Sequence, residues 1–200
     1  MRIHISEWSC IMSLNLSSKL EAGHVYRRED LTQFSKAVDR DLSTLLERGE
    51  LEKVAGGLYY KPAHSRFGQL PPNENELVAS FLKETKFLLY SWNQYNSLGL
   101  GLTQLYNRFV VYNHKRHGLF KLAGREFEFK NFARGFPKKL SPEFLLVDLL
   151  NNLSELAEDA DLVKTNLKKK LSSFDLKKVH ENCESYGKVS TKKFLRGICH

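Results

Sequence analysis

Apolar residues recur at helical spacing near the start of the chain. Leu14, Leu16 and Leu20 predict a first short helix, and Gly23 is placed to end it. Residues 28–34 predict a second short helix. Both stretches are too short to be stable alone, so we expect them to pack on further elements.

A third helix has the clearest pattern. Val38, Leu42 and Leu45 share one face at helical spacing, which predicts a buried stripe. Ser35 is the expected N-cap, because its hydroxyl can accept a hydrogen bond from a free backbone N–H. The helix is expected to run to Arg48.

The pattern then changes to that of a tight hairpin. Gly49 ends the third helix, and residues 51–55 and 58–61 predict two strands. Gly56-Gly57 is a two-residue turn of the kind that needs positive φ, and Pro62 ends the second strand.

Three helices followed by a hairpin is the order of a winged helix, a fold that often places its third helix in the DNA major groove. We therefore predict a winged-helix DNA-binding domain over residues 12–66. Residues 1–11 are expected to be a disordered extension without a role in the fold. Residues 64–73, which include Pro71-Pro72, are expected to be a linker.

The rest of the chain predicts an α+β protein: the winged helix is followed by a mixed α/β domain over residues 74–155 that ends in helices. Ser91 and Ser141 are expected N-caps, the latter followed by Pro142 at the first helical position. Expected helices and strands are 74–84, 86–90, 91–98, 108–112, 119–122, 125–130 and 141–153, with further helices at 162–171, 174–183 and 191–198.

The positive charge is concentrated at the end of the chain. The formal net charge is +8 with a pI near 9.3. Residues 160–200 hold ten Lys or Arg against four Asp or Glu, so they supply +6 of that excess. We expect residues 156–200 to form a basic helical tail. A second surface for phosphates, a toxin or RNA is a hypothesis for its lysines Lys168, Lys169, Lys170, Lys177 and Lys178.

Cysteine usage and hydropathy bear on location. The three cysteines, Cys10, Cys183 and Cys199, are odd in number and widely spaced, which argues against a disulfide framework and a zinc site. No apolar run approaches the roughly 20 residues of a membrane span. We expect a cytoplasmic protein with no membrane partner, no metal and no cofactor.

Three stretches of the chain resemble a known family. They are LERGELEKVAGGLYYKP (46–62), LLYSWNQYNSLGLGLTQ (88–104) and FVVYNHKRHGLFKLAGREFEFK (109–130). In order and spacing they resemble the AbiEi-like antitoxins of type IV toxin–antitoxin systems, over roughly residues 13–155.

The resemblance implies a function. In that family a winged helix binds double-stranded promoter DNA and represses its own operon. A second domain counters a nucleotidyltransferase-like toxin, without needing a stable complex with it. By this resemblance the protein is an antitoxin and transcriptional regulator, and not an enzyme.

Residues on the outward face of the third helix are the candidates for reading DNA. Arg can bind guanine through two hydrogen bonds, whereas Ser and Thr are weaker readers. Basic residues of the hairpin and of the second helix suit phosphates. The candidates are Lys36, Arg40, Ser43 and Thr44 for the groove, and Arg27, Arg28, Lys53 and Lys61 for the backbone. Asp39 and Asp41 are expected to weaken the field through Lys36–Asp39 and Arg40–Asp41 pairs.

Two alternatives remain open at this point. Glu128-Phe129-Lys130 has the acid–x–Lys spacing of metal-dependent nucleases, although no upstream acidic motif accompanies it and no catalytic residue is assigned. A winged helix can also act only as a protein-interaction module, without specific DNA binding. The oligomeric state is not predicted.

Overall fold

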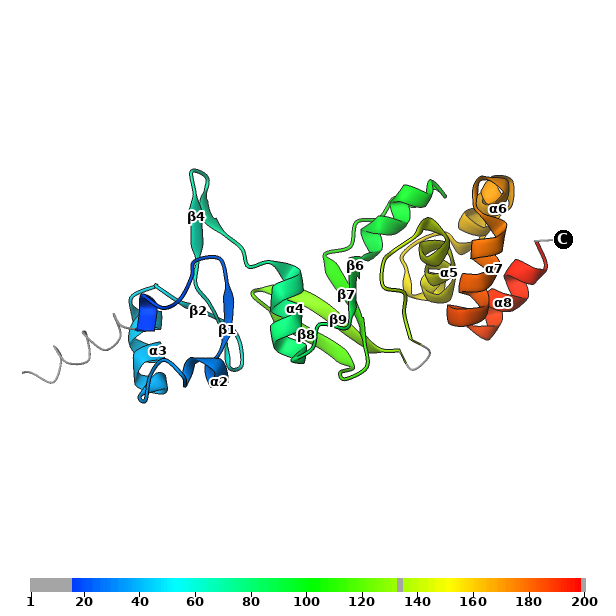
Figure 1. Cartoon of the computed structure of the whole chain (residues 1–200). Helices are drawn as coiled ribbons and strands as arrows, with labels where there is room; N and C mark the ends of the chain where they lie inside the picture. The colour runs from blue at the N-terminus through cyan, green and yellow to red at the C-terminus, as the bar shows by residue number, and fades with distance from the viewer. Residues whose placement is uncertain (1–15, 133–134, 199–200) are drawn as a thin grey trace, which may run out of the picture. The chain divides into compact units, whose positions relative to one another are not determined.

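The structure of the protein is a computed structural model in which residues 16–132 and 135–198 are described (Figure 1). It is a mixed α+β protein that divides into two compact units. The first comprises Met1–Thr85 with Lys121–Arg125, and the second comprises Lys86–Phe120 with Glu126–His200. The expected extension at residues 1–11 lies outside the described residues.

The described part of the first unit begins with two short helices and a three-stranded sheet. In chain order these are β1 (Val25–Arg27), α2 (Arg28–Leu31), α3 (Val38–Glu47), β2 (Glu52–Ala55) and β3 (Leu58–Tyr60). The sheet order is β1-β3-β2, with both pairs antiparallel. The second and third predicted helices and the hairpin appear in the expected order, with the addition of β1, whereas the predicted first helix lies largely outside the described residues.

The core of this unit is built by the stripe that the sequence indicated. Val38, Leu42 and Leu45 are buried with Leu16 and Leu31. Burying side chains of this size contributes about 1.5–3 kcal/mol each. The α3 stripe therefore fixes which face of the helix points outward.

The two glycine positions behave largely as expected. Gly49 follows α3 at φ +69°, a left-handed conformation that glycine adopts at little cost. Ala55 pairs with Leu58, so Gly56-Gly57 is a two-residue turn, although only Gly57 has positive φ (+71°).

The predicted start of α3 was wrong by two residues. The N-cap is Ala37, and no side chain caps it. Ser35 instead accepts a hydrogen bond from the Ala37 N–H at 3.0 Å and donates to the buried Asp41 at 2.6 Å. Ser35 therefore binds Asp41 and the turn before the helix, and does not cap α3.

A second hairpin replaces the expected linker. β4 (Ala63–Ser65) and β5 (Gly68–Leu70) pair in a two-stranded sheet of their own. It projects from the three-stranded sheet in Figure 1, and its base is held where the Tyr60 hydroxyl donates to the Leu70 carbonyl at 2.8 Å. The segment is short and polar, so it lacks the alternation that marks longer strands.

Helix α4 (Glu74–Leu82) belongs to the first unit, not to the expected domain over residues 74–155. The Val25 N–H donates to Glu76 at 2.9 Å, and Lys83 pairs with Glu29 at 2.7 Å. Arg125, from the short segment that clusters with this unit, pairs with Glu74 at 2.5 Å. These contacts draw α4 towards β1 and α2.

The second unit is built on a four-stranded mixed sheet. Its strands are β6 (Leu88–Ser91), β7 (Arg108–Asn113), β8 (Gly118–Leu122) and β9 (Arg125–Asn131), in the order β6-β7-β9-β8. β6 and β7 are antiparallel, whereas β7 and β9 are parallel. Segment η1 (Trp92–Leu98) is a 3₁₀ helix, and Ser91 caps it as predicted by accepting from the Asn93 N–H.

Four helices complete this unit: α5 (Pro142–Asn152), α6 (Ala160–Lys170), α7 (Leu176–Tyr186) and α8 (Val189–Arg196). Short 3₁₀ turns, η2 (Leu153–Glu155) and η3 (Leu171–Ser173), follow α5 and α6. Ser141 caps α5 as predicted, accepting from the Phe144 N–H at 3.1 Å.

The C-terminal helices are not a separate tail. Val163, Leu167, Val179 and Leu195 join the buried core that α5 and the sheet form. The apolar residues of these helices therefore face the shared core, and most of their charged residues lie on the outer side. Residues 156–200 belong to the second unit, which corrects the expected boundary at residue 155.

Within the described ranges, no helix is long and apolar enough to cross a bilayer. Cys183 is buried on α7, while Cys10 and Cys199 lie outside the described residues.

Candidate nucleic-acid interface

Three of the residues predicted to read DNA lie on the outward face of α3, and the fourth, Lys36, lies in the turn just before the N-cap Ala37. Lys36, Arg40 and Ser43 are exposed, and Thr44 is half-buried. They lie away from the buried stripe of Val38, Leu42 and Leu45. The helix therefore presents Arg40 and two hydroxyls, beside the exposed acidic side chains of Asp39 and Glu47.

The acidic residues of α3 do not pair with these groups as expected. Arg28, and not Lys36, binds Asp39, through two hydrogen bonds of 2.6 and 2.5 Å. The bonds to Arg28 hold the pKa of the Asp39 carboxyl below its usual value. Among the described residues, no carboxylate lies within ion-pair distance of Lys36, so its ammonium faces solvent.

Asp41 is buried and turned toward Ser35, and its Oδ1 lies 3.8 Å from Arg40 Nε. The expected Arg40–Asp41 contact is thus present as a long ion pair. At this distance, with the Arg40 side chain about half exposed, it contributes on the order of 1 kcal/mol or less.

The two hydroxyls of the face are already used inside the helix. Ser43 donates to the Asp39 carbonyl at 3.0 Å and Thr44 donates to the Arg40 carbonyl at 3.1 Å. Each oxygen can still accept a hydrogen bond, so both side chains suit donors such as base amino groups.

The two hairpin lysines differ. Lys53, on β2, is exposed and has no carboxylate at ion-pair distance within the described residues. Lys61 is half-buried, and its ammonium donates to the Ser17 and Leu20 carbonyls at 2.7 and 2.8 Å. The ammonium of Lys61 is thus already bound to two backbone carbonyl oxygens, which argues against its role as a phosphate contact.

The arginines at the start of α2 are both committed to ion pairs. Arg27 contacts Glu29 at 2.5 Å and Asp30 at 3.2 Å. Arg28 binds Asp39. Phosphate contacts from either residue would require exchange of a partner, which exposed pairs permit but which the sequence did not anticipate.

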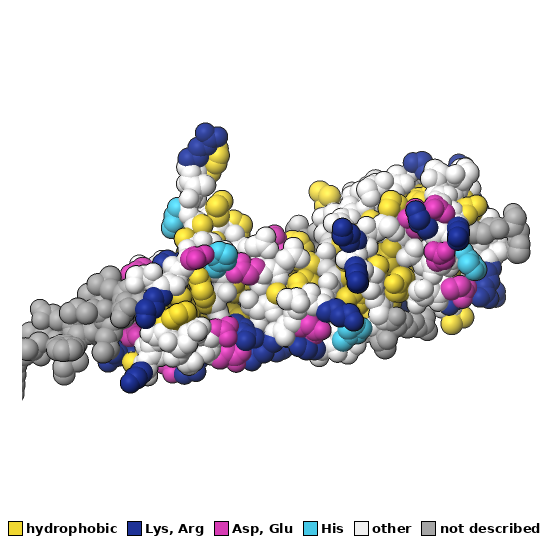
Figure 2. All heavy atoms as spheres, viewed as in Figure 1, with side chains coloured by type: hydrophobic (Ala, Val, Ile, Leu, Met, Phe, Trp, Pro, Cys, Tyr) yellow, Lys and Arg dark blue, Asp and Glu magenta, His cyan; other side chains and the backbone are white. Residues whose placement is uncertain are grey.

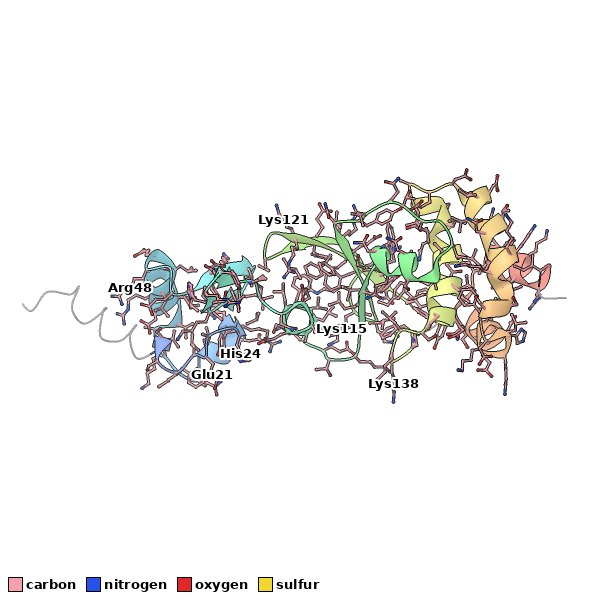
Figure 3. All side chains as sticks on the ribbon, turned by 90° about the horizontal axis from the view of Figure 1, so that it is seen from above. Glu21, His24, Arg48, Lys115, Lys121 and Lys138 are labelled. Atoms are coloured by element: carbon pink, nitrogen blue, oxygen red, sulfur yellow. The ribbon has the colours of Figure 1, made fainter. Side chains whose placement is uncertain are left out.

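A shallow hollow lies at the start of α3. Its volume is about 400 Å³. Arg28, Lys36 and Arg40 contribute the positive charge of its lining, and Asp39 contributes a negative charge that Arg28 offsets. Arg48 stands at the opposite end of α3 and points outward (Figure 3).

Sequence reasoning missed a further basic position at the tip of the β4–β5 hairpin. Phe67 is 84% exposed, and the Arg66 guanidinium lies over its ring, 4.6 Å from the centroid. Basic and apolar side chains gather at this tip in Figure 2. The glycine in Arg66-Phe67-Gly68 was the sequence signal for a turn here. In the structure Gly68 has the positive φ (+108°) that a tight turn uses.

The possible second basic surface lies in the second unit. Lys168, Lys169 and Lys170 form the last turn of α6, where positive charge is favourable for the helix dipole. Lys177 and Lys178 begin α7, just after the η3 turn, and Lys178 pairs with Asp175 at 3.3 Å. All five side chains are exposed. The turn gathers them at one end of the two helices.

The acid–x–Lys candidate forms an ion-pair group. Lys130 Nζ lies 3.7 Å from Glu128 and 3.0 Å from Glu155, and Glu128 also lies 3.6 Å from Arg108. Within the described residues, no three His, Cys, Asp or Glu side chains gather closely enough to hold a metal ion. These ion pairs account for the charged residues that alternate with phenylalanines along β9.

A buried polar cluster in the second unit was also missed. The carboxylate of Asp148, on α5, accepts hydrogen bonds from the hydroxyls of Tyr90, Tyr95 (2.7 Å) and Tyr112 (2.6 Å). Asn152 donates to the same carboxylate at 3.2 Å. Asp148 is 1% exposed. The signal in the sequence was a single charged residue inside an apolar helix.

Burial dominates the titration of this cluster. It raises the pKa of the Asp148 carboxyl above its usual value, although the three tyrosine hydrogen bonds act in the opposite direction. Burial, together with the nearby Asp148 charge, also raises the pKa values of Tyr90, Tyr95 and Tyr112. The hydroxyls therefore remain protonated donors at neutral pH.

Comparison with known proteins establishes the fold only. No protein-family model and no curated protein matches the sequence. The crystal structure of the RV2827C protein from Mycobacterium tuberculosis is similar, with a TM-score of 0.59 and 16% identity over 98% of this chain and 78% of that one. The shared fold thus includes the C-terminal helices.

Proposed function

We propose that the protein is a cytoplasmic DNA-binding repressor of its own operon and the antitoxin of a type IV toxin–antitoxin system. In this proposal residues 16–60 of the first unit act as a winged helix, with α3 as the recognition helix and β2–β3 as the wing. The antitoxin role rests on the family resemblance of the three sequence stretches.

The observation that carries the DNA-binding proposal is the division of α3 into two faces. One face is buried, while the other exposes Arg40, and Lys36 is exposed in the turn just before the helix. Arg28 offsets the charge of Asp39, and Asp41 is turned into the unit. The acidic groups nearest Arg40 and Lys36 are therefore offset or turned inward.

The proposed contacts follow from side-chain chemistry. Arg40 has the planar guanidinium that binds guanine O6 and N7 in the major groove. Lys36 and Lys53 are point charges that suit phosphates. Arg66, at the tip of the second hairpin, is a further candidate for the DNA backbone. Lys61 is not included, because its ammonium is bound to carbonyl oxygens.

A fluorescence titration tests the DNA-binding half of the proposal. The duplex is the protein's own upstream region, the control is a scrambled duplex of equal length, and each is measured at two salt concentrations. We expect tighter binding to the upstream duplex, weakening as salt rises because counterions are released. Equal and weak binding to both duplexes would favour a protein-interaction module instead.

Co-expression tests the antitoxin half. The neighbouring gene is induced with and without this protein, and growth is followed. We expect rescue by the wild type and equal rescue by Arg40→Ala, because that side chain belongs to the proposed DNA face. Failure to rescue by the wild type would remove the antitoxin role and leave the repressor role intact.

A further inference from the structure

The tip of the β4–β5 hairpin exposes an aromatic ring that the first unit does not use for packing. The Phe67 side chain is 84% exposed, more than any other large apolar side chain in the described ranges. Neither strand of this hairpin contains a buried residue, so the ring has no core of its own to join. An apolar side chain in this position gains free energy only when a partner covers it.

The tip is a well-defined turn. Ser65 pairs with Gly68, which leaves Arg66 and Phe67 as the two residues of the turn. The Ser65 hydroxyl accepts a hydrogen bond from the Phe67 N–H at 3.1 Å and donates to the Gly68 carbonyl at 3.1 Å. The base of the hairpin is bound to the end of β3. The ring therefore stands at the end of a hydrogen-bonded ribbon.

The charge around the ring is positive. The Arg66 guanidinium lies over it, 4.6 Å from the ring centroid, and no carboxylate of the described ranges lies at ion-pair distance from Arg66. Residues 61–73 contain no Asp or Glu. Glu52 contacts the hairpin further along, where it accepts a hydrogen bond from Gln69 at 2.6 Å. A partner of the tip must therefore accept an aromatic ring and a cation at the same place (Figure 2).

Duplex DNA offers both at its minor groove. The bases present flat faces on which an aromatic ring stacks, and the phosphates on either side favour a cation. Proteins that bind this groove frequently insert a Phe or another apolar side chain between two base pairs and bend the duplex. The groove is about 6 Å wide, too narrow for two paired strands with their side chains, but a two-residue tip presents only two side chains to it.

We propose that Phe67 inserts between two base pairs from the minor groove of duplex DNA, while Arg66 binds the phosphates beside it. The inference rests on the DNA-binding function proposed above, because the same unit carries α3, and it adds a contact from outside the β1-β3-β2 sheet. Insertion separates two stacked base pairs, and pyrimidine–purine steps allow this most easily. The hairpin should therefore favour such a step and bend the duplex there.

Phe67→Ala tests the insertion when the full chain is titrated with the upstream duplex at a series of salt concentrations. Binding should weaken by about tenfold at each salt concentration, because the stacking of bases on the ring is lost. The slope of log affinity against log salt should stay the same, since no charge is removed. Arg66→Ala should instead make that slope shallower by about one. Equal affinity of Phe67→Ala and wild type for the duplex would overturn the proposal.

Phe67→Trp reads the stacking directly. An indole stacked on bases loses fluorescence, so the emission of this variant should fall on DNA binding by more than that of the wild type, whose tryptophans are Trp8 and Trp92. An equal fall in both proteins would overturn the insertion.

Leu105→Ala is the matched control, because the Leu105 side chain is 78% exposed but belongs to the second unit. It should leave affinity for the duplex unchanged. Equal weakening by Leu105→Ala and Phe67→Ala would show that any loss of exposed apolar surface lowers the affinity, and would overturn the assignment.

The wild type separates this inference from the proposed function. Preferential, salt-dependent binding by the wild type with unchanged affinity of Phe67→Ala would keep the repressor role and remove the insertion. Absence of binding by the wild type would remove both. Sedimentation covers the remaining occupant: a wild-type dimer that Phe67→Ala converts to a monomer would assign the ring to a second copy of this chain, and would also overturn the insertion.

Discussion

The two units treat an aspartate in opposite ways. Asp39 in the first unit lies on the surface, with a side chain 72% exposed and paired to Arg28. Asp148 in the second is buried and is held by three tyrosine hydroxyls. Exposed ion pairs contribute about 1 kcal/mol or less, whereas a buried polar network is costly to break.

This contrast separates binding from stability. The cations of α3 stand on a surface whose core is made by other residues, so they can change without unfolding the unit. The Asp148 cluster is buried, and its hydrogen bonds connect α5 to strands β6 and β7. We therefore expect substitutions in the first unit to alter DNA affinity, and substitutions in the cluster to alter the free energy of unfolding.

Asp148→Ala should have the largest effect. It leaves three buried hydroxyls without their acceptor, and the free energy of unfolding should fall by about 3–5 kcal/mol. Urea unfolding followed by circular dichroism measures this. Asp161→Ala, at a side chain that is 96% exposed, is the control and should change it by less than about 0.5 kcal/mol. Equal effects of the two would contradict the contrast.

The same carboxyl should give a pH dependence. Its folded-state pKa is raised, so between the unfolded value of about 3.9 and the folded value the folded state holds a proton that the unfolded state has lost. Stability from this group is fully present below the unfolded pKa and declines as pH rises, by about 1.4 kcal/mol per unit of pKa difference.

Asp148→Asn removes this titration, so its unfolding free energy is the reference at each pH. The advantage of the wild type over the variant should shrink as pH rises from 3.5 and then level off. An advantage that grows with pH would mean that the folded state lowers this pKa.

Lys61→Met should destabilise the first unit by about 1–3 kcal/mol, because two charge-assisted hydrogen bonds to carbonyl oxygens are lost while the length of the side chain is kept. DNA affinity of the folded protein should stay within about twofold, a change well below 1.4 kcal/mol. Urea unfolding and DNA titration are both needed. Weaker DNA binding at unchanged stability would restore Lys61 as a phosphate contact.

Lys53→Met should have the smallest effect. Unlike Lys61→Met, it should change DNA binding and leave the free energy of unfolding unchanged. Its ammonium faces solvent, so stability should be unchanged. The slope of log affinity against log salt should become shallower by about one, the share of a single phosphate contact. An unchanged slope would remove the β2–β3 hairpin from the proposed interface.

Sequence reasoning predicted the elements that have a regular spacing of apolar residues or a residue that marks a turn or a helix end. The α3 stripe, the turn at Gly56-Gly57 and the caps at Ser91 and Ser141 are confirmed. In each case the signal is local, because it depends on residues a few positions apart.

The features it missed depend on distant partners. Lys61 lies 44 residues from Ser17, and Tyr90 lies 58 residues from Asp148, so neither contact leaves a local pattern. The same holds for the boundary at residue 155, because the apolar stripes of the last helices do not reveal that α5 is their partner. The β4–β5 hairpin was missed for another reason: its strands are too short to establish a period.

The central claim is that α3 reads DNA through Arg40, and one titration tests it most directly. Wild type and Arg40→Ala are compared on the upstream and scrambled duplexes, with Arg196→Ala, at an exposed arginine of the second unit, as the control. Arg40→Ala should weaken binding to the upstream duplex by about 1–3 kcal/mol and change binding to the scrambled duplex far less. Equal affinity of Arg40→Ala and wild type for the upstream duplex would contradict the account.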